Sequence, residues 1–269
     1  MSLRINTNVE AFNSHRQLVA TSDKLGKAME RLSSGYRINR AADDAAGLAI
    51  TEKLRGQITG LDQAQRNGQD AISLVQTAEG SLTEVHAMLQ RIRELAVQFK
   101  NGSLSTSDKS AIQSEVNMLA SEIERIGSTA QFNGIQLLNT SQTISFQVGA
   151  QDGEIITVTT ISLGVSVPGS VYALSTSGAT DISEIDTAID AISAQRAQFG
   201  AVQNRLEYTL QNLAIYQENL TSSESRIRDV DMASEMVNFT KLQILQQSGT
   251  AMVAQANQLP QSVLQLLKG

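Results

Sequence analysis

The chain has 269 residues, with 21 Lys and Arg against 27 Asp and Glu, two His, no Cys and no Trp. Its net charge of −6 argues against nucleic-acid binding as the main function, because affinity for a phosphate backbone comes from clustered cations. The absence of Cys excludes disulfides and thiolate metal sites. No apolar run approaches the ~20 residues of a membrane-spanning helix, so we expect no membrane insertion. The first residues also lack the pattern of a conventional secretory signal.

The charge is distributed unevenly along the chain. Residues 1–66 carry ten Lys and Arg and seven Asp and Glu, a net charge of +3. That leaves eleven basic against twenty acidic residues, a net charge of −9, for residues 67–269. Opposite charges on two parts of one chain can favour head-to-tail self-association.

The first element predicted is an amphipathic helix over roughly the first 32 residues. Leu18, Leu25 and Leu32 recur every seven residues, and Phe12 flanks their apolar stripe. Such a helix is marginally stable by itself, because most helix stability in proteins comes from packing the apolar face. We therefore expect it to pair with the other end of the chain or with neighbouring copies.

The next stretch, LSSGYRINRAADDAAG at residues 32–47, interrupts the helical pattern. Gly35 suits the left-handed end of a helix, and Asp43 or Asp44 suits the N-cap of the next one. Arg37 and Arg40 lie between them and can pair with the acidic remainder of the chain. A plain surface loop is the alternative interpretation of this segment.

The strongest pattern in the sequence predicts a long helix from Asp44 to Lys100. Two heptad series run through it with only apolar or small residues, which indicates a coiled-coil or bundle helix. They comprise Leu61, Gly68, Val75, Leu82, Leu89 and Ala96, and Ala64, Ala71, Ala78, Val85, Ile92 and Phe99.

A shorter helix is predicted to begin at Ser107 or Asp108 and to end before Phe132. The β-branched residues that follow, with a glycine turn at 149–153, predict a β-hairpin over about 143–158. The fold class expected is therefore mainly α, with long antiparallel helices forming coiled-coil or bundle rods and a small β-hairpin in the middle.

The C-terminal part repeats the helical theme. A third heptad series recurs without a miss, at Ile185, Ile192, Phe199, Leu206, Leu213 and Leu220, although polar Gln195 interrupts the matching offset series. A further amphipathic segment is predicted from Ile227 through Ile244, and Pro260 is expected to perturb the tail.

Nothing in the sequence predicts catalysis, a cofactor site or a metal site. His15 and His86 are distant in sequence and lack a Cys partner, and no common catalytic motif is present. The acidic residues after Arg228 are better explained by ion pairs on a helix surface than by acid–base chemistry.

Several longer motifs closely resemble bacterial flagellins. LSSGYRINRAADDAAGLAI, LQRIRELAVQ and FNGIQLLN are similar to the N-terminal half of that family, and ENLTSSESRIRDVDMASE and QANQLPQSVLQLLKG to its C-terminal half. The resemblance spans almost the entire chain. It implies a subunit that polymerises into the bacterial flagellar filament for motility, that is exported by the flagellar type III route, and that is extracellular or periplasmic.

The resemblance also implies a domain organisation. Residues 1–42 with 227–269 correspond to an inner coiled-coil domain that lines the filament tube, and residues 43–226 to a rod domain of three long helices with the hairpin. Only about forty residues separate the two family halves, so no outer variable domains are expected. Gly35, Arg37, Arg40, Asp43 and Asp44 then form an interdomain linker. Packing inside the inner domain or between subunits is expected at Phe12, Leu18, Leu25, Leu32, Ile244, Leu259, Val263, Leu264 and Leu266.

Partners follow from the same resemblance. The main partner is the chain itself, as a helical homopolymer, with an export chaperone and the cap and hook-junction proteins as further partners. Arg91, Leu95 and Glu115 match the patch through which flagellin monomers contact a toll-like receptor. Two alternatives remain: a hook–filament junction protein and a cytosolic coiled-coil signalling scaffold.

Overall fold

The computed structural model describes residues 8–167, 169, 174 and 181–268, without the side chains of residues 165, 181 and 259–268. The chain divides into two compact units. Unit 1 comprises Met1–Gly56 and Asn219–Gly269, and unit 2 comprises Gln57–Glu218. Five long helices dominate the described residues, which confirms the predicted class of long helices with a small central hairpin.

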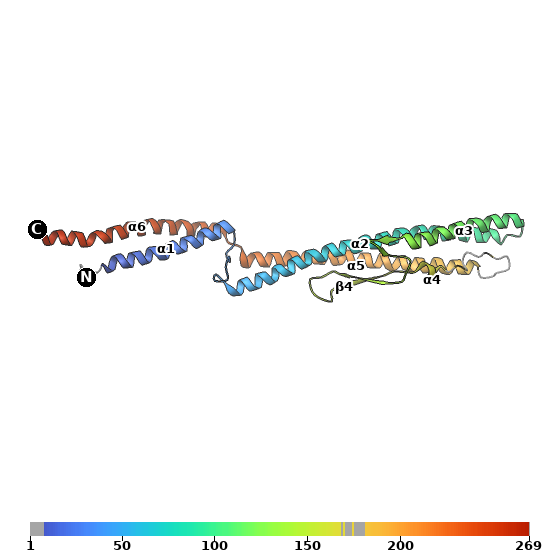
Figure 1. Ribbon diagram of the computed structural model, residues 1–269, viewed down its shortest axis with the longest axis horizontal. Coiled ribbons are helices and arrows are strands. Elements are labelled where there is room, and N and C mark those ends of the chain that lie inside the picture. The colour runs from blue at the N-terminus through green and yellow to red at the C-terminus, as the bar shows by residue number, and fades with distance from the viewer. Residues whose placement is uncertain (1–7, 168, 170–173, 175–180, 269) are drawn as a thin grey trace. The chain divides into compact units, whose positions relative to one another are not determined.

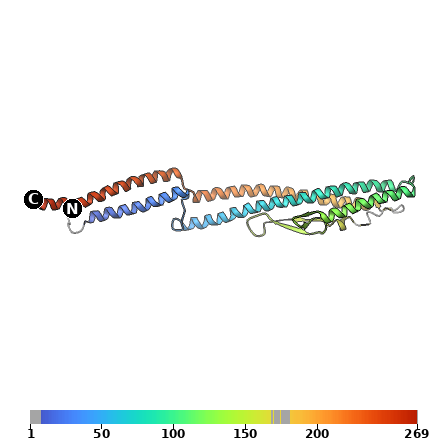
Figure 2. The ribbon, with the colours of Figure 1, turned by 45° about the horizontal axis from the view of Figure 1, so that its top comes forward.

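Unit 1 contains α1 (Val9–Ser34) and α6 (Met232–Lys268), with the start of α2 and the end of α5. Asn8 caps α1 by accepting a hydrogen bond from the Ala11 amide, and Gly35 ends the helix with a φ of 76°. Asp231 caps α6 by accepting hydrogen bonds from the amides of Ala233 and Ser234. Figures 1 and 2 show α1 and α6 side by side, with the start of α1 and the end of α6 at the same end of the pair.

Helix α2 (Ala45–Phe99) supplies the core of unit 2. All twelve positions of its two heptad series are buried, as their spacing predicts. Asp44 caps the helix, since its Oδ1 accepts a hydrogen bond of 2.8 Å from the Gly47 amide. The predicted start and end of this helix are therefore confirmed.

Helices α3 (Thr106–Thr129) and α5 (Asp181–Arg228) pack against α2. Both run antiparallel to it. Phe99 and Arg91 of α2 contact Lys109 and Glu115 of α3 in that order. Arg93 and Glu79 contact Asp186 and Arg196 of α5 in that order. A capping box at Ser105 and Asp108 starts α3. On α5, the heptad residues from Ile185 through Leu213 are buried, whereas Leu220 is only half-buried.

The predicted hairpin consists of β3 (Thr143–Gln147) and β4 (Ile155–Thr159), paired antiparallel. Val148 and Ile156 pack against Ala71 of α2 and Leu206 of α5, so the hairpin covers the seam between these helices. Buried Gln195 donates a hydrogen bond of 2.9 Å to the Thr159 carbonyl, which explains a polar residue in the heptad pattern. Short strands β1 (Gln131–Phe132) and β2 (Ile135–Gln136) and the helix α4 (Leu163–Ser166) complete the unit.

Two local expectations are wrong. The predicted amphipathic segment does not begin at Ile227, because α5 continues to Arg228 and α6 begins at Met232. Pro260 does not interrupt the tail, since α6 runs through it to Lys268. A proline in a helix interior removes one backbone hydrogen bond, and it can kink the helix without ending it.

Candidate self-association surface and linker

Helices α1 and α6 form an antiparallel pair within unit 1. At one end the Asn8 side chain donates a hydrogen bond of 2.7 Å to the Ala256 carbonyl, and at the other Arg31 lies 4.0 Å from Glu235. Between these points the helices approach closely, since a Cβ on Gly249 would lie 3.1 Å from Leu18 Cδ1. The predicted pairing of the two chain ends is therefore present within one chain.

This pair buries little of its own apolar surface. Among the described residues, Ala28 of α1 and Leu242 and Ala256 of α6 are the buried apolar residues of the two helices. The exposed apolar residues are far more numerous: Val9, Phe12, Val19, Met29, Met232, Met236, Val237, Ile244, Leu245 and Met252. We call these ten residues the outer apolar face. Exposed apolar surface of this extent is typical of a protein–protein interaction site.

The apolar residues of α6 point in several directions. Met236 and Val237 are adjacent in sequence, as are Ile244 and Leu245, and successive helix residues point about 100° apart. Leu242 faces yet another direction and is buried. A helix that is apolar on all sides is typical of one buried on all sides, and α1 covers only one side of α6.

The predicted packing residues divide into three groups. Leu18, Leu25 and Leu32 are half-buried, along α1. Phe12 and Ile244 lie on the outer apolar face, with 71% and 59% of their surface exposed. The remaining predicted residues, Leu259, Val263, Leu264 and Leu266, lie in α6 where the side chains are outside the described set.

The linker between α1 and α2 pairs with the segment between α5 and α6. Arg37 donates a backbone hydrogen bond of 2.6 Å to the Arg228 carbonyl, and Val230 donates one of 3.0 Å to Gly35. Tyr36 and Asp229 form an isolated β-bridge between these bonds. The two connections are thus joined by main-chain bonds, and the segment is more than a loose surface loop.

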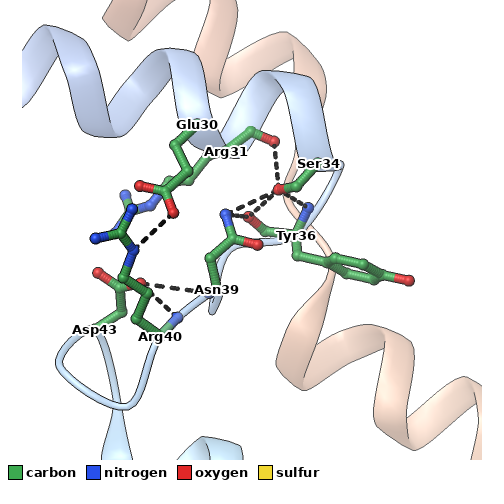
Figure 3. Close-up of polar contacts among 7 residues, drawn as sticks. All are labelled: Glu30, Arg31, Ser34, Tyr36, Asn39, Arg40 and Asp43. Atoms are coloured by element: carbon green, nitrogen blue, oxygen red, sulfur yellow. Dashed lines mark hydrogen bonds and ion pairs between the residues drawn. The ribbon is translucent and has the colours of Figure 1, made fainter.

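A polar network stabilises the turn that follows (Figure 3). The Asp43 carboxylate accepts hydrogen bonds from the amides of Asn39 and Arg40. The Arg40 guanidinium donates a bond of 2.9 Å to Glu30, and the Asn39 side-chain amide donates one of 2.8 Å to Ser34. The bond from the Arg40 amide is the main cause of a lowered pKa at Asp43, and the charges of Arg31 and Lys27 add to it.

Three linker contacts were not predicted from the sequence. Arg228 lies over the Tyr36 ring, 4.5 Å from its centroid, and its Nη1 lies 3.6 Å from Glu52. Ile38 is buried although it lies in a polar segment. The alternation of Tyr36, Arg37 and Ile38 is the signal that could have indicated a short extended pairing segment.

Ile38 is accommodated by a glycine in the first turn of α2. A Cβ on Gly47 would lie 2.8 Å from Ile38 Cδ1 and 2.9 Å from Asp44 Cγ. Such distances are too short for ordinary van der Waals contact, so a side chain here must displace either Ile38 or the N-cap. The linker therefore depends on glycine at this position.

Gly47→Ala is expected to lower the free energy of unfolding of unit 1 by roughly 1–3 kcal/mol, the usual cost of overpacking. Urea unfolding of the unassembled chain measures this. The matched control is Gly56→Ala, also in α2, where a Cβ would meet nothing within 4 Å. It is expected to raise stability by about 0.5–1 kcal/mol, because alanine favours the helix. Equal effects of both substitutions would contradict the proposed contact.

The Asp43 network is expected to weaken in acid. A carboxylate whose pKa is lowered by folding stabilises the fold above its unfolded pKa, about 3.9, and loses that contribution as the pH falls through the lower folded value. The stability advantage of the wild type over Asp43→Asn should therefore be constant between about pH 5 and 7 and shrink below about pH 4. Urea unfolding across this range tests it, and a difference independent of pH would refute it.

The predicted receptor patch lies in unit 2. The Arg91 guanidinium donates hydrogen bonds of 3.0 and 2.8 Å to Glu115 and of 3.2 Å to Glu94, and these contacts raise the pKa of Arg91. Both Arg91 and Glu115 keep partly exposed side chains. Leu95, however, is only 2% exposed and belongs to the core. The structure thus joins two of the three residues at the surface and places the third beneath them.

Within the part of the chain that the structure describes, no group of three or more His, Cys, Asp or Glu is arranged to hold a metal ion. No described helix is both long and apolar enough to cross a membrane.

Both halves of this chain match models of the bacterial flagellin family. Residues 5–143 match the bacterial flagellin N-terminal helical region, and residues 182–267 match the bacterial flagellin C-terminal helical region. A flagellin of Halalkalibacterium halodurans is 53% identical over 272 residues, which cover 98% of this chain and 99% of that protein. The flagellin of Bacillus subtilis is 46% identical over 306 residues, covering 99% and 100%.

Two further similarities come from a filament protein and a solved structure. The flagellar filament 33 kDa core protein of Treponema phagedenis is 49% identical over 284 residues, which cover 98% of this chain and 99% of that protein. The crystal structure of Bacillus cereus flagellin aligns with a TM-score of 0.51 and 33% identity, covering 55% of this chain and 88% of that one. Neither the junction protein nor the signalling scaffold gains support from these similarities.

Proposed function

This chain belongs to the bacterial flagellin family and is a structural subunit of the flagellar filament, and we propose that it polymerises by burying the outer apolar face between neighbouring copies. The observation that carries this proposal is the set of exposed large apolar residues of α6, which point in several directions while α1 packs against one side of the helix. Full burial of a large aliphatic side chain contributes about 1.5–3 kcal/mol, and covering one that is half exposed contributes roughly half of that. A few such residues per subunit are enough to favour the polymer.

The test uses exposed residues whose replacement leaves the free subunit intact. The double substitution Val237→Gln and Ile244→Gln is expected to abolish or greatly reduce polymerisation, because two apolar contacts become buried polar groups. Both side chains are exposed, so the helical circular dichroism of the free chain should not change. Negative-stain electron microscopy and sedimentation measure polymer.

The matched control keeps the same positions apolar. Val237→Ile with Ile244→Leu preserves the apolar surface and is expected to give filaments in normal yield. The proposal fails if the glutamine variant polymerises as well as this control.

We further propose that the domain division expected from the sequence holds in the filament. In that division residues 1–42 with 227–269 line the tube, and residues 43–226 lie outside them without outer variable domains. The linker residues Gly35, Arg37, Arg40, Asp43 and Asp44 would then set the angle between the two layers and help to fix subunit register. The backbone pairing of Gly35–Arg37 with Arg228–Val230 supports this role, because it restrains both connections together.

The remaining partners are proposals of the same kind. Export by the flagellar type III route would bring the chain to a surface or periplasmic filament, with a chaperone before export and cap and hook-junction proteins at the filament ends. A purely structural role, without catalytic activity, is in keeping with the family and with a surface built for packing. Recognition of the monomer by a toll-like receptor is a secondary proposal. Arg91 and Glu115 could make that contact directly, with Leu95 supporting them from the core.

A further inference from the structure

Methionine is unusually exposed in this protein. Of the six methionines that the structure describes, Met88 packs against the core of unit 2 and the other five are exposed. Four of these five lie on α1 and α6, with between 48% and 62% of their surface exposed, and we call them the unit 1 methionines: Met29, Met232, Met236 and Met252. The fifth, Met118 of α3 in unit 2, is 69% exposed.

Three unit 1 methionines lie at the same level of the helix pair. The contact between Arg31 and Glu235 places the end of α1 beside the start of α6. Met29 precedes Arg31 by two residues, while Met232 and Met236 flank Glu235 and are four residues apart, on one face of α6. These three methionines therefore lie near the same end of the α1–α6 pair.

Met252 lies farther along the pair, at a groove between α1 and α6. The groove has a volume of about 320 Å³ and is also lined by Leu18, Leu245 and Gly249. The unit 1 methionines thus occupy two separate places on the surface that the proposed function buries. Polarisable, flexible methionine suits such an interface, because it adapts its shape to the neighbour.

We propose that the unit 1 methionines are oxidation sites for peroxides in the unassembled subunit, and that their sulfoxides block polymerisation; the second half rests on the proposed function. The thioether sulfur attacks one peroxide oxygen and the O–O bond breaks. The sulfur loses two electrons and receives a hydroxyl group. The departing hydroxide then takes the proton of that hydroxyl group, which leaves an S=O bond and one water molecule. The chain has neither Cys nor Trp, so Met is its most readily oxidised residue type.

The physical reason for the block is the polarity of the product. A sulfoxide is a strong hydrogen-bond acceptor, and burying it among apolar side chains without a donor is unfavourable. Assembly would also hide the unoxidised sulfurs from solvent. Oxidation would therefore act on free subunits and leave completed filaments largely unaffected. Oxidised subunits would then be excluded from growing filaments.

The first experiment maps the reaction. Free subunits and filaments are treated with hydrogen peroxide, and sulfoxides are located by peptide mass spectrometry. In free subunits the unit 1 methionines and Met118 should oxidise several-fold faster than Met88, since access to the sulfur governs the rate. In filaments the unit 1 methionines should be protected. Equal rates at those four sites in both states would overturn the proposal.

The second experiment measures polymerisation on filament seeds after oxidation. The critical concentration of the oxidised wild type should rise roughly tenfold or more, the expected effect of placing polar groups in an apolar contact. A quadruple variant with Met29→Leu, Met232→Leu, Met236→Leu and Met252→Leu should show the same critical concentration before and after this treatment, whatever its starting value. The control Met118→Leu, which removes the most exposed of the six described methionines, should fail in the same way as the wild type. Equal loss in the quadruple variant would overturn the proposal.

A rescue measurement tests, without any substitution, whether methionine sulfoxides cause the loss of polymerisation. Treating the oxidised wild type with both methionine sulfoxide reductases should restore the original critical concentration, because each enzyme reduces one sulfoxide epimer. Failure to restore it would overturn the proposed block. Failure of unoxidised wild-type subunits to polymerise would instead refute the proposed function, while the mapping of free subunits would still test the oxidation sites.

Discussion

Removing residues 1–32 or residues 236–269 is expected to abolish filaments while leaving unit 2 helical. Either deletion removes one helix of the α1–α6 pair and much of the outer apolar face. The two buried clusters of unit 2, in contrast, use residues between Ala71 and Leu206 and none from the deleted segments. Loss of several apolar contacts of about 1.5–3 kcal/mol each removes the driving force for polymerisation.

Electron microscopy tests for filaments of the truncated chains, and circular dichroism tests their helicity. The expected helical signal is that of the full chain less the deleted helix, with a cooperative thermal transition retained by unit 2. Filaments of normal form from either truncation would refute the assignment of the outer apolar face. Loss of the cooperative transition would show instead that unit 2 needs the chain ends to fold.

Phe199→Ala is expected to have the largest effect of any single truncation in unit 2. Its ring is fully buried in the cluster that joins α2, α3, α5 and the hairpin. Replacing a buried Phe by Ala typically lowers the free energy of unfolding by about 3–5 kcal/mol, because it loses apolar burial and leaves a cavity. Urea unfolding of unassembled subunits measures this change.

Tyr208→Ala is the matched control for this substitution. Tyr208 lies on the same helix, nine residues later, and is 73% exposed. Its removal should change the free energy of unfolding by no more than about 0.5 kcal/mol. If the two substitutions destabilised the free subunit equally, the heptad assignment of α5 would be wrong.

Periodic burial made most of the fold predictable from the sequence. A residue repeated every seven positions returns to the same helix face. The heptad spacing from Leu61 to Ala96 and from Ile185 to Leu213 therefore predicted that these residues are buried, as they are. Local chemistry indicated the boundaries as well. Asp44 caps α2 because its short side chain can accept a hydrogen bond from the first turn. Gly35 ends α1 because glycine readily adopts a positive φ.

Prediction was less successful where the partner of a residue is distant in the chain. Arg228 meets Tyr36 and Glu52 nearly two hundred residues away. The break after Arg228 also follows from this pairing, since Val230 bonds to Gly35 and so leaves the helix. The apolar periodicity of the sequence shows no sign of this break, because it predicted one continuous segment from Ile227 through Ile244.

By itself the sequence determined that this protein is a set of long amphipathic helices with one hairpin, and its motifs indicated the flagellin family. These properties are local or periodic, so neighbouring residues suffice to define them. Only the tertiary structure decided which apolar residues remain uncovered, because exposure depends on which helices meet. It showed that α1 leaves much of α6 exposed and that methionines gather there, and these two observations carry both proposals.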